Sequence, residues 1–351
     1  MKDYYVIGLM SGTSIDGIDL VYVNFRYDKS WNFKIINSKT YSYDKGWEII
    51  LHELLNNDIE SIKEIDKKYT KHLSDCILKF INEFSIKNID FISSHGHTAL
   101  HDPSSFMTYQ IGNLPNISQF TGLKVICDFR SNDIKLGGHG APLVPVGEKY
   151  LFPEFKTFIN LGGFANITKK MDNRLIAYDI CPVNIVLNYL SNMIGLKYDD
   201  MGNIAKSGKL NKQLYNNLES LAYYKLNFPK SLGVEWVNNY MFPILKKFLN
   251  IPKEDMLNTF SNHFAKQIAN NIDNGNKILI TGGGAYNNYL IEKIKFLSNS
   301  TIVIPNSEIV EFKEALIFAF LGVLRDSNIN NCYSSVTGAS KDHSSGNIFI
   351  P

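Results

Sequence analysis

The feature that most constrains the fold is the opening stretch, in which two short apolar runs are joined by a loop of small polar residues. The stretch runs from Val6 to Val23 and leaves no room for a helix between the runs, so it predicts a β-hairpin. Glycines such as Gly12 and Gly17 let the backbone approach an anion closely. We therefore expect this loop to bind phosphate.

Two carboxylates, Asp16 and Asp19, follow the glycines and are oxygen ligands of the kind that hold magnesium, directly or through water. The loop has no Gly-x-x-x-x-Gly-Lys pattern and no helix directly after its glycines, so it is neither a Walker loop nor a dinucleotide fingerprint. An ordinary polar hairpin loop is the alternative.

The composition predicts a soluble cytoplasmic protein. With 351 residues, of which 44% are hydrophobic, the chain suits two domains of moderate size. A net charge of +2 without basic runs gives no indication of a nucleic acid or membrane partner. The four cysteines are far apart, which is typical of reduced thiols. The most apolar later stretch, Ala315–Leu324, is about half the length needed to span a bilayer.

Three histidines follow a predicted short strand, Phe91–Ser94. His95, His97 and His101 either shape a polar pocket in a loop or hold a metal ion, as in some metal-dependent hydrolases. The other histidines do not recur in a matching pattern, so the pocket is favoured. The next predicted strand, 124–130, leads through Asp133 into the irregular segment 137–145, which lines a cleft or links two domains.

A second cycle starts with a repeat of the hairpin pattern at 156–168, around Asn160, Gly162 and Gly163. A strand then ends at Asp179 and a helix follows over 185–193. A carboxylate at the end of a strand can act as a general base, although a turn or capping role is common.

Two further elements carry candidate ligand contacts. A buried strand, Lys277–Thr281, precedes Gly282, Gly283 and Gly284, which would let a flat ring such as adenine approach the backbone. A last helix is predicted over 308–324, and Glu314 lies near its start. Between the second cycle and these elements, Pro229–Trp236 is expected to be a non-helical insert.

These pieces, in this order, resemble the anhydro-N-acetylmuramic acid kinase family of the sugar kinase/Hsp70/actin superfamily. The resemblance covers the chain nearly end to end, through the segments 8–17, 94–103, 137–145, 160–166, 229–231, 282–284, 314–315 and 336–339. It implies an α/β fold of two actin-like (ribonuclease H-like) domains around a central cleft. We expect an N-terminal domain over 1–134, onto which the tail 337–351 packs back, and a C-terminal domain over 135–336. A homodimer is compatible with the sequence.

The family uses MgATP to phosphorylate O6 of 1,6-anhydro-N-acetylmuramic acid while water opens the anhydro bridge, in cell-wall recycling. By resemblance, Asp179 is the catalytic base that takes a proton from this water. The remaining roles implied are ATP phosphate and magnesium binding by Gly12, Thr13, Ser14, Asp16, Gly17 and Asp19, phosphate binding by Asn160, Gly162 and Gly163, adenosine packing by Gly282, Gly283 and Gly284, and sugar binding by His97, His101, Asp133, Asn184 and Glu314.

One motif departs from the family, which usually has Asp-Thr-Gly-Pro-Gly-Asn where this chain has Asp179–Asn184 with Ile180, Cys181 and Val183. We expect Cys181 and Val183 to place side chains where backbone otherwise approaches ligand, and Val183 to resist a positive φ. His97 and His139 stand where the family usually has Gln. A kinase for another anhydro or amino sugar, or a non-catalytic ATP-binding regulatory protein, is the alternative.

Overall fold

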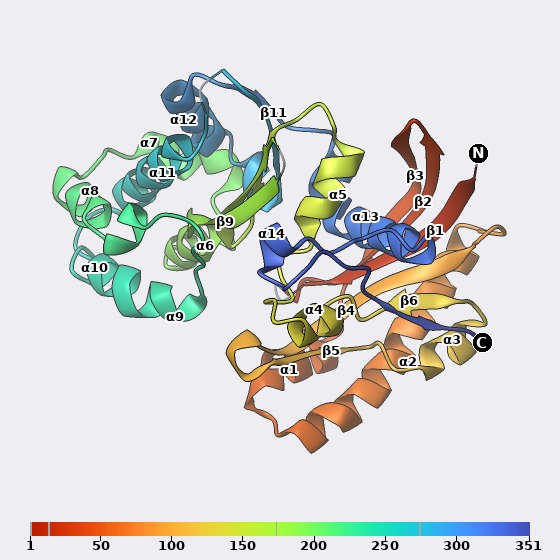
Figure 1. Ribbon diagram of the computed structural model, residues 1–351. Coiled ribbons are helices and arrows are strands. Elements are labelled where there is room, and N and C mark those ends of the chain that lie inside the picture. Colours follow the sequence, from red (N-terminus) through yellow and green to blue (C-terminus); the bar gives the residue numbers. More distant parts are fainter. Residues whose placement is uncertain (1, 13–14, 173, 274) are drawn as a thin grey trace. The chain divides into compact units, whose positions relative to one another are not determined.

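The computed structural model describes residues 2–12, 15–172, 174–273 and 275–351, which form two compact α/β units (Figure 1). The first unit comprises the chain up to Pro153 together with Phe312–Pro351, and the second comprises Glu154–Glu311. These limits differ from the expected ones at 134/135 and 336/337, because the helix after residue 143 and most of the last long helix belong with the first sheet.

The first unit is built on a mixed sheet whose strands lie in the order β12-β6-β4-β1-β2-β3, with β5 paired to β4. The predicted opening hairpin is confirmed, since β1 and β2 pair antiparallel from Asp3↔Arg26 to Ser11↔Ile18. The tail returns to this sheet, where β12 pairs antiparallel with β6. The strands are β1 (Asp3–Ser11), β2 (Ile18–Asp28), β3 (Ser30–Tyr41), β4 (Phe91–Asp102), β5 (Met107–Ile111), β6 (Val125–Cys127) and β12 (Asn347–Phe349).

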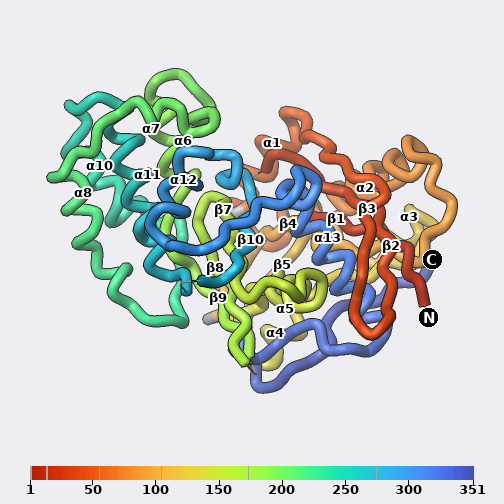
Figure 2. Tube along the Cα trace, turned by 90° about the horizontal axis from the view of Figure 1, so that it is seen from above, coloured from red at the N-terminus to blue at the C-terminus, as the bar shows by residue number. Residues whose placement is uncertain are grey.

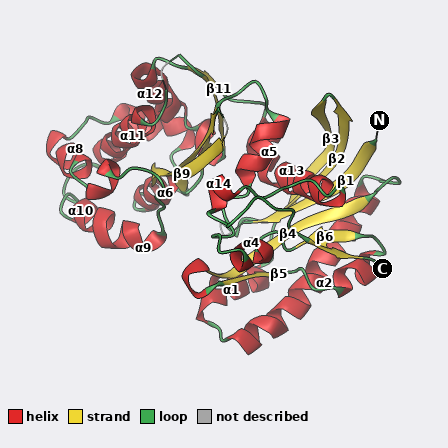
Figure 3. Cartoon of the chain, viewed as in Figure 1, coloured by secondary structure: helices red, strands yellow, loops and turns green. Residues whose placement is uncertain are grey.

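Helices cover both faces of this sheet (Figure 3). Alternate residues of a strand point to opposite faces, so Ile7 and Leu9 of β1 join the core with α2. Gly8, between them, lies against α13, where a Cβ would come within 2.3 Å of the Ala315 carbonyl oxygen. The helices are α1 (Lys45–His52), α2 (Ile59–Glu83), α3 (Asn116–Thr121), α4 (Ser131–Lys135), α5 (Val144–Leu151), α13 (Ser307–Asp326) and α14 (Ser334–Thr337).

The second unit repeats the strand order of the first, as β11-β10-β7-β8-β9. Figure 2 labels β7, β8, β9 and β10 close together in the trace of this unit. The strands are β7 (Thr157–Leu161), β8 (Phe164–Met171), β9 (Arg174–Pro182), β10 (Lys277–Thr281) and β11 (Thr301–Val303). Its helices are α6 (Asn184–Asn192), α7 (Asn203–Ser207), α8 (Lys212–Glu219), α9 (Val234–Trp236), α10 (Phe242–Lys246), α11 (Lys253–Asn270) and α12 (Asn288–Ser298). In both units an antiparallel meander of three strands is followed by strands parallel to its first. The predicted α/β fold with two sheets is confirmed.

Three local expectations were wrong. The segment 95–102 is not a loop, because β4 continues through it and pairs with β5. Strand β9 does not end at Asp179 but runs to Pro182, since its pairing with β8 extends to Phe164↔Pro182. Within the insert 229–236, residues 234–236 form the short helix α9. Among the described residues, no helix combines the length and the apolar character that crossing a bilayer requires.

Candidate active site

The predicted base, Asp179, is held by the insert that follows it in sequence. Its Oδ2 accepts a hydrogen bond of 2.8 Å from the backbone N–H of Leu232, and its own N–H donates to the Lys230 carbonyl oxygen at 3.3 Å. The Tyr223 hydroxyl donates to the Asp179 carbonyl oxygen at 2.7 Å. Burial raises the pKa of Asp179, and the N–H of Leu232 acts against that rise. The result is an oriented, partly exposed carboxylate of increased basicity.

Aromatic rings fix the insert itself. The Lys230 ammonium lies 4.7 Å from the centroid of the Tyr223 ring and 5.9 Å from that of Tyr178. Tyr178 stacks on Phe228 with an interplanar angle of 11°. Tyr223 and the backbone of Leu232 are contacts to the base that the sequence reasoning missed. A cation close to two aromatic rings was not visible in the sequence because Lys230 is far from Tyr178 along the chain.

Both predicted glycine loops of the second unit lie together. Gly282 has a φ of +82°, and a Cβ there would come within 2.6 Å of Asn160 Oδ1. A Cβ on Gly284 would come within 2.7 Å of Leu161 Cβ. The Asn184 side-chain amide donates to the Leu161 carbonyl oxygen at 3.3 Å. The loop after β7, the loop after β10 and the start of α6 are therefore in mutual contact.

The departure at 180–183 does not have the expected effect. Cys181 and Val183 are both fully buried in the core of the second unit, so their side chains do not occupy a ligand-facing position. Val183 has a φ of −136°, and no positive φ is required of it. Its N–H donates to the Gly163 carbonyl oxygen at 2.8 Å. The expected intrusion was wrong because β9 continues through this segment, which turns Cys181 into the core.

In the first unit the loop between β1 and β2 carries the predicted phosphate and magnesium contacts. Asp16 is exposed in this loop, whereas Asp19 lies on β2, where its Oδ1 accepts a hydrogen bond of 2.6 Å from Thr40 Oγ1. The Gly12 carbonyl oxygen accepts from the N–H of Ile15 at 3.2 Å, and Gly17 is buried against β3. The predicted contacts Thr13 and Ser14 lie outside the described residues.

His97 belongs to a buried hydrogen-bond cluster at the end of β1. Its Nδ1 lies 2.9 Å from Ser11 Oγ, which also lies 2.6 Å from the Tyr43 hydroxyl and accepts from the Tyr69 hydroxyl at 2.9 Å. Burial lowers the pKa of His97 to about 4, so its imidazole is neutral at pH 7. His101, nearer the surface, has Nδ1 at 3.1 Å from Thr108 Oγ1. The two histidines are thus in different environments on one strand.

Arg130 is a further residue that was not among the candidates predicted from the sequence. Its Nε donates to His95 Nε2 at 3.0 Å, and its Nη1 donates to the Gly140 carbonyl oxygen at 2.6 Å. Burial lowers its pKa to about 10, and the charge of Glu314 acts against that change. Burial in turn raises the pKa of Glu314, and the positive charges of Lys313 and Arg130 act against this rise. An arginine at the end of the predicted strand 124–130 was the available signal.

Asp133 is fully buried, so its carboxylate is not accessible to a sugar. Its Oδ2 accepts a hydrogen bond of 2.7 Å from the Gly140 N–H, and its Oδ1 accepts one of 2.7 Å from Thr337 Oγ1. Direct contact with a substrate would require this carboxylate to be uncovered. His95 likewise has both ring nitrogens engaged, because Nδ1 lies 2.9 Å from the Gly96 carbonyl oxygen. Among the described residues, His95, His97 and His101 do not form a metal-ligand cluster.

Comparison with known proteins defines the class. The family model described as anhydro-N-acetylmuramic acid kinase matches residues 4–351. The anhydro-N-acetylmuramic acid kinase of Sulfurimonas denitrificans is 32% identical over 372 residues, covering 99% of this chain and all of that protein. The enzyme of the same name from Haemophilus influenzae is 32% identical over 380 residues, covering 99% and 98%. The duplicated α/β units and these matches define a sugar kinase. The chain belongs to the anhydro-N-acetylmuramic acid kinase family.

Proposed function

We propose that this protein transfers the γ-phosphoryl group of ATP to O6 of 1,6-anhydro-N-acetylmuramic acid while water opens the anhydro bridge. The products are N-acetylmuramic acid 6-phosphate and ADP, in cytoplasmic recycling of cell-wall sugar. The observation that carries the proposal is the state of Asp179, an oriented and partly buried carboxylate within a chain that matches the kinase family from residue 4 to residue 351.

Asp179 supplies the proton transfer. Its carboxylate takes a proton from the water whose oxygen attacks C1, the C1–O6 bond breaks, and O6 attacks the γ-phosphorus as ADP leaves. A general base works best when its pKa approaches the working pH, and burial moves the pKa of Asp179 in that direction. The hydrogen bond from Leu232 occupies Oδ2 and so fixes the direction in which the carboxylate faces the water.

The glycine loops fit a nucleotide. At Gly282 a Cβ would collide with Asn160 Oδ1, so glycine lets the loops after β7 and β10 pack closely, and Gly282, Gly283 and Gly284 would offer bare backbone to the adenosine. Gly12, Gly17, Gly162 and Gly163 would hold the phosphates of ATP. Asp16 and Asp19 would hold the magnesium ion bound with ATP, which would neutralise charge on the transferred phosphoryl group.

Sugar binding by His97, His101, Asn184 and Glu314 stays part of the proposal. The Glu314 carboxyl can exchange hydrogen bonds with hydroxyl and acetamido groups of the sugar. His97 is only 2% exposed, so direct contact with the sugar would require its imidazole to be uncovered. Asp133 would act indirectly, because its oxygens hold Gly140 and Thr337.

The test is ADP release from MgATP with 1,6-anhydro-N-acetylmuramic acid and, separately, a panel of other anhydro and amino sugars. Asp179→Asn keeps the shape and removes the base, so kcat should fall at least about 100-fold. Asp200→Asn, at an exposed aspartate of the same unit, is the matched control and should leave kcat unchanged.

The outcomes separate the alternatives. Turnover of another sugar in preference to 1,6-anhydro-N-acetylmuramic acid would assign a different substrate. ATP binding without turnover of any sugar would favour a regulatory protein. Full activity of Asp179→Asn would refute the role of the base.

A further inference from the structure

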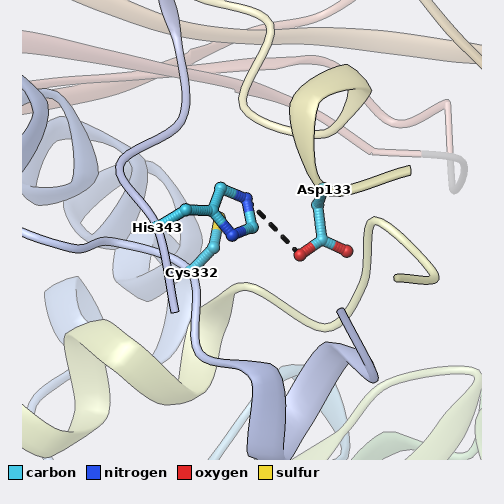
Figure 4. Close-up of side chains that lie close together, drawn as sticks. All are labelled: Asp133, Cys332 and His343. Atoms are coloured by element: carbon cyan, nitrogen blue, oxygen red, sulfur yellow. Dashed lines mark ion pairs between the residues drawn. The ribbon is translucent and has the colours of Figure 1, made fainter. Parts of the chain in front are cut away.

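A buried cluster of the first unit brings together three metal-ligating side chains, one of which is the predicted sugar contact Asp133 (Figure 4). Asp133 lies on α4, whereas Cys332 and His343 lie in the C-terminal segment. One potential ligand atom from each residue lies within 4.8 Å of the others. The three side chains are 0%, 1% and 6% exposed, respectively. Carboxylate oxygen, thiol sulfur and imidazole nitrogen are the ligands of protein-bound zinc.

The backbone fixes two of these ligands relative to each other. Cys332 and His343 form an isolated antiparallel bridge, in which each N–H donates to the other's carbonyl oxygen at 3.1 Å. Side chains that are directly opposite in such a pair lie on the same face. The segment between them contains α14, whose Thr337 donates to Asp133 Oδ1 at 2.7 Å. The third ligand is thus attached to the same turn.

The imidazole of His343 presents an unpartnered atom to the cluster. Its Nδ1 lies 3.1 Å from the Lys341 carbonyl oxygen and must donate to it, which assigns the lone pair of a neutral ring to Nε2. Nε2 is buried without a hydrogen-bond partner among the described residues, and it lies 3.6 Å from Asp133 Oδ1. A neutral imidazole and a carboxylate that face each other in a buried site are two acceptors, an arrangement that is unfavourable unless a proton or a metal cation lies between them.

We propose that Asp133, Cys332 and His343 bind one Zn²⁺ ion. The carboxylate and the thiolate together neutralise the two positive charges, so the buried site carries no net charge. The Cys332 thiol proton is released to solvent on binding. Tetrahedral zinc places its ligand atoms about 3.3–3.7 Å apart, and the distance from His343 to Asp133 already lies in this range.

The surroundings suit such a site. Gly140 and Thr337 hold the Asp133 carboxylate, and Lys341 holds His343 through Nδ1, which are the outer contacts that orient metal ligands. Three protein ligands leave the fourth position to a water molecule. Sulfur and imidazole ligands disfavour magnesium, so this site is distinct from the one that would serve ATP. Bound zinc would fasten the C-terminal segment to α4.

The experiment uses the full chain, stripped with a chelator, then given one equivalent of Zn²⁺ and desalted. One zinc per chain should remain on the wild type, and His343→Gln or Cys332→Ala should weaken zinc binding at least 100-fold in competition with a chromophoric chelator. Cys76→Ala removes another buried cysteine of the same unit and should retain the metal.

Co²⁺ provides a spectroscopic measurement on the wild type itself. The stripped wild type should gain a thiolate-to-cobalt charge-transfer band with one equivalent of Co²⁺, and Cys332→Ala should lack it. Absence of both retained zinc and this band in the wild type would overturn the proposal. Zinc binding that survives in both His343→Gln and Cys332→Ala, or that is lost in Cys76→Ala alone, would also overturn it.

Discussion

A buried ion pair between α5 and α13 gives the sharpest test of what holds the first unit together. Lys313 Nζ lies 2.7 Å from Glu148 Oε1, and each side chain is only 3% exposed. The second carboxylate oxygen of Glu148 is buried without a hydrogen-bond partner among the described residues. That lone oxygen costs about 1–3 kcal/mol of desolvation, so the pair stabilises the fold less than its short distance suggests.

The expected magnitudes follow from burial. Lys313→Met or Glu148→Met leaves an uncompensated buried charge and should lower the free energy of unfolding by about 3–5 kcal/mol. The double variant removes both charges and keeps similar volumes, so it should lie within about 1 kcal/mol of the wild type or exceed it. The decrease in the free energy of unfolding of the double variant should be smaller than the sum of the two single-variant decreases by at least about 3 kcal/mol.

The assay is urea-induced unfolding followed by tryptophan fluorescence. Trp31 and Trp47 lie in the first unit and Trp236 in the second, so a Trp236→Phe background makes the signal specific for the first unit. Lys67→Met breaks an exposed pair with Glu64 and should cost less than about 1 kcal/mol. Single losses no larger than this control, or a double variant as unstable as the summed singles, would refute the reasoning.

Two further predictions concern acid stability and the glycine loops. Burial lowers the pKa of His97 from 6.5 to about 4. The folded state therefore binds a proton at His97 less readily than the unfolded state, and the free energy of unfolding should be unaffected above about pH 6.5 and fall by about 3 kcal/mol as the pH decreases to about 4. Urea unfolding at several pH values should show this loss in the wild type and not in His97→Gln, and identical pH profiles would contradict it. Gly282→Ala, with φ +82° and a contact of 2.6 Å to Asn160, should destabilise by more than about 1 kcal/mol. At Gly163 the nearest atom to an added Cβ is 4.0 Å away, so Gly163→Ala should raise the KM for ATP and change the free energy of unfolding by less than about 0.5 kcal/mol. A Gly163→Ala variant less stable than Gly282→Ala would count against the loop geometry.

Local patterns in the sequence predicted the elements that set the fold. The hairpins of β1–β2 and β7–β8 follow from apolar runs that are separated by too few residues for a helix. Strand β10 has the predicted bounds, Lys277–Thr281, because the polar segments on either side of this short apolar run mark where the strand begins and ends. The position of Asp179 near the end of a strand left a turn or capping role open, and only the family resemblance implied that it is the base; its hydrogen bond from Leu232 agrees with a positioned carboxylate.

Such local patterns could not predict contacts between residues that are far apart in the sequence. Segment 95–102 is a strand because β5 pairs with it, and Cys181 is buried because β9 continues through it. The domain limits depend on α13, whose contact with Gly8 joins residues more than 300 positions apart in the sequence. Asp133 is enclosed by Thr337, and Cys332 faces His343 across a bridge. Periodicity and spacing report the conformation that a segment favours by itself, so the sequence alone determined the two hairpin-led α/β cycles and their glycine loops. Burial, tautomer and pKa depend on which distant groups exclude water and donate hydrogen bonds, and these only the tertiary structure decided.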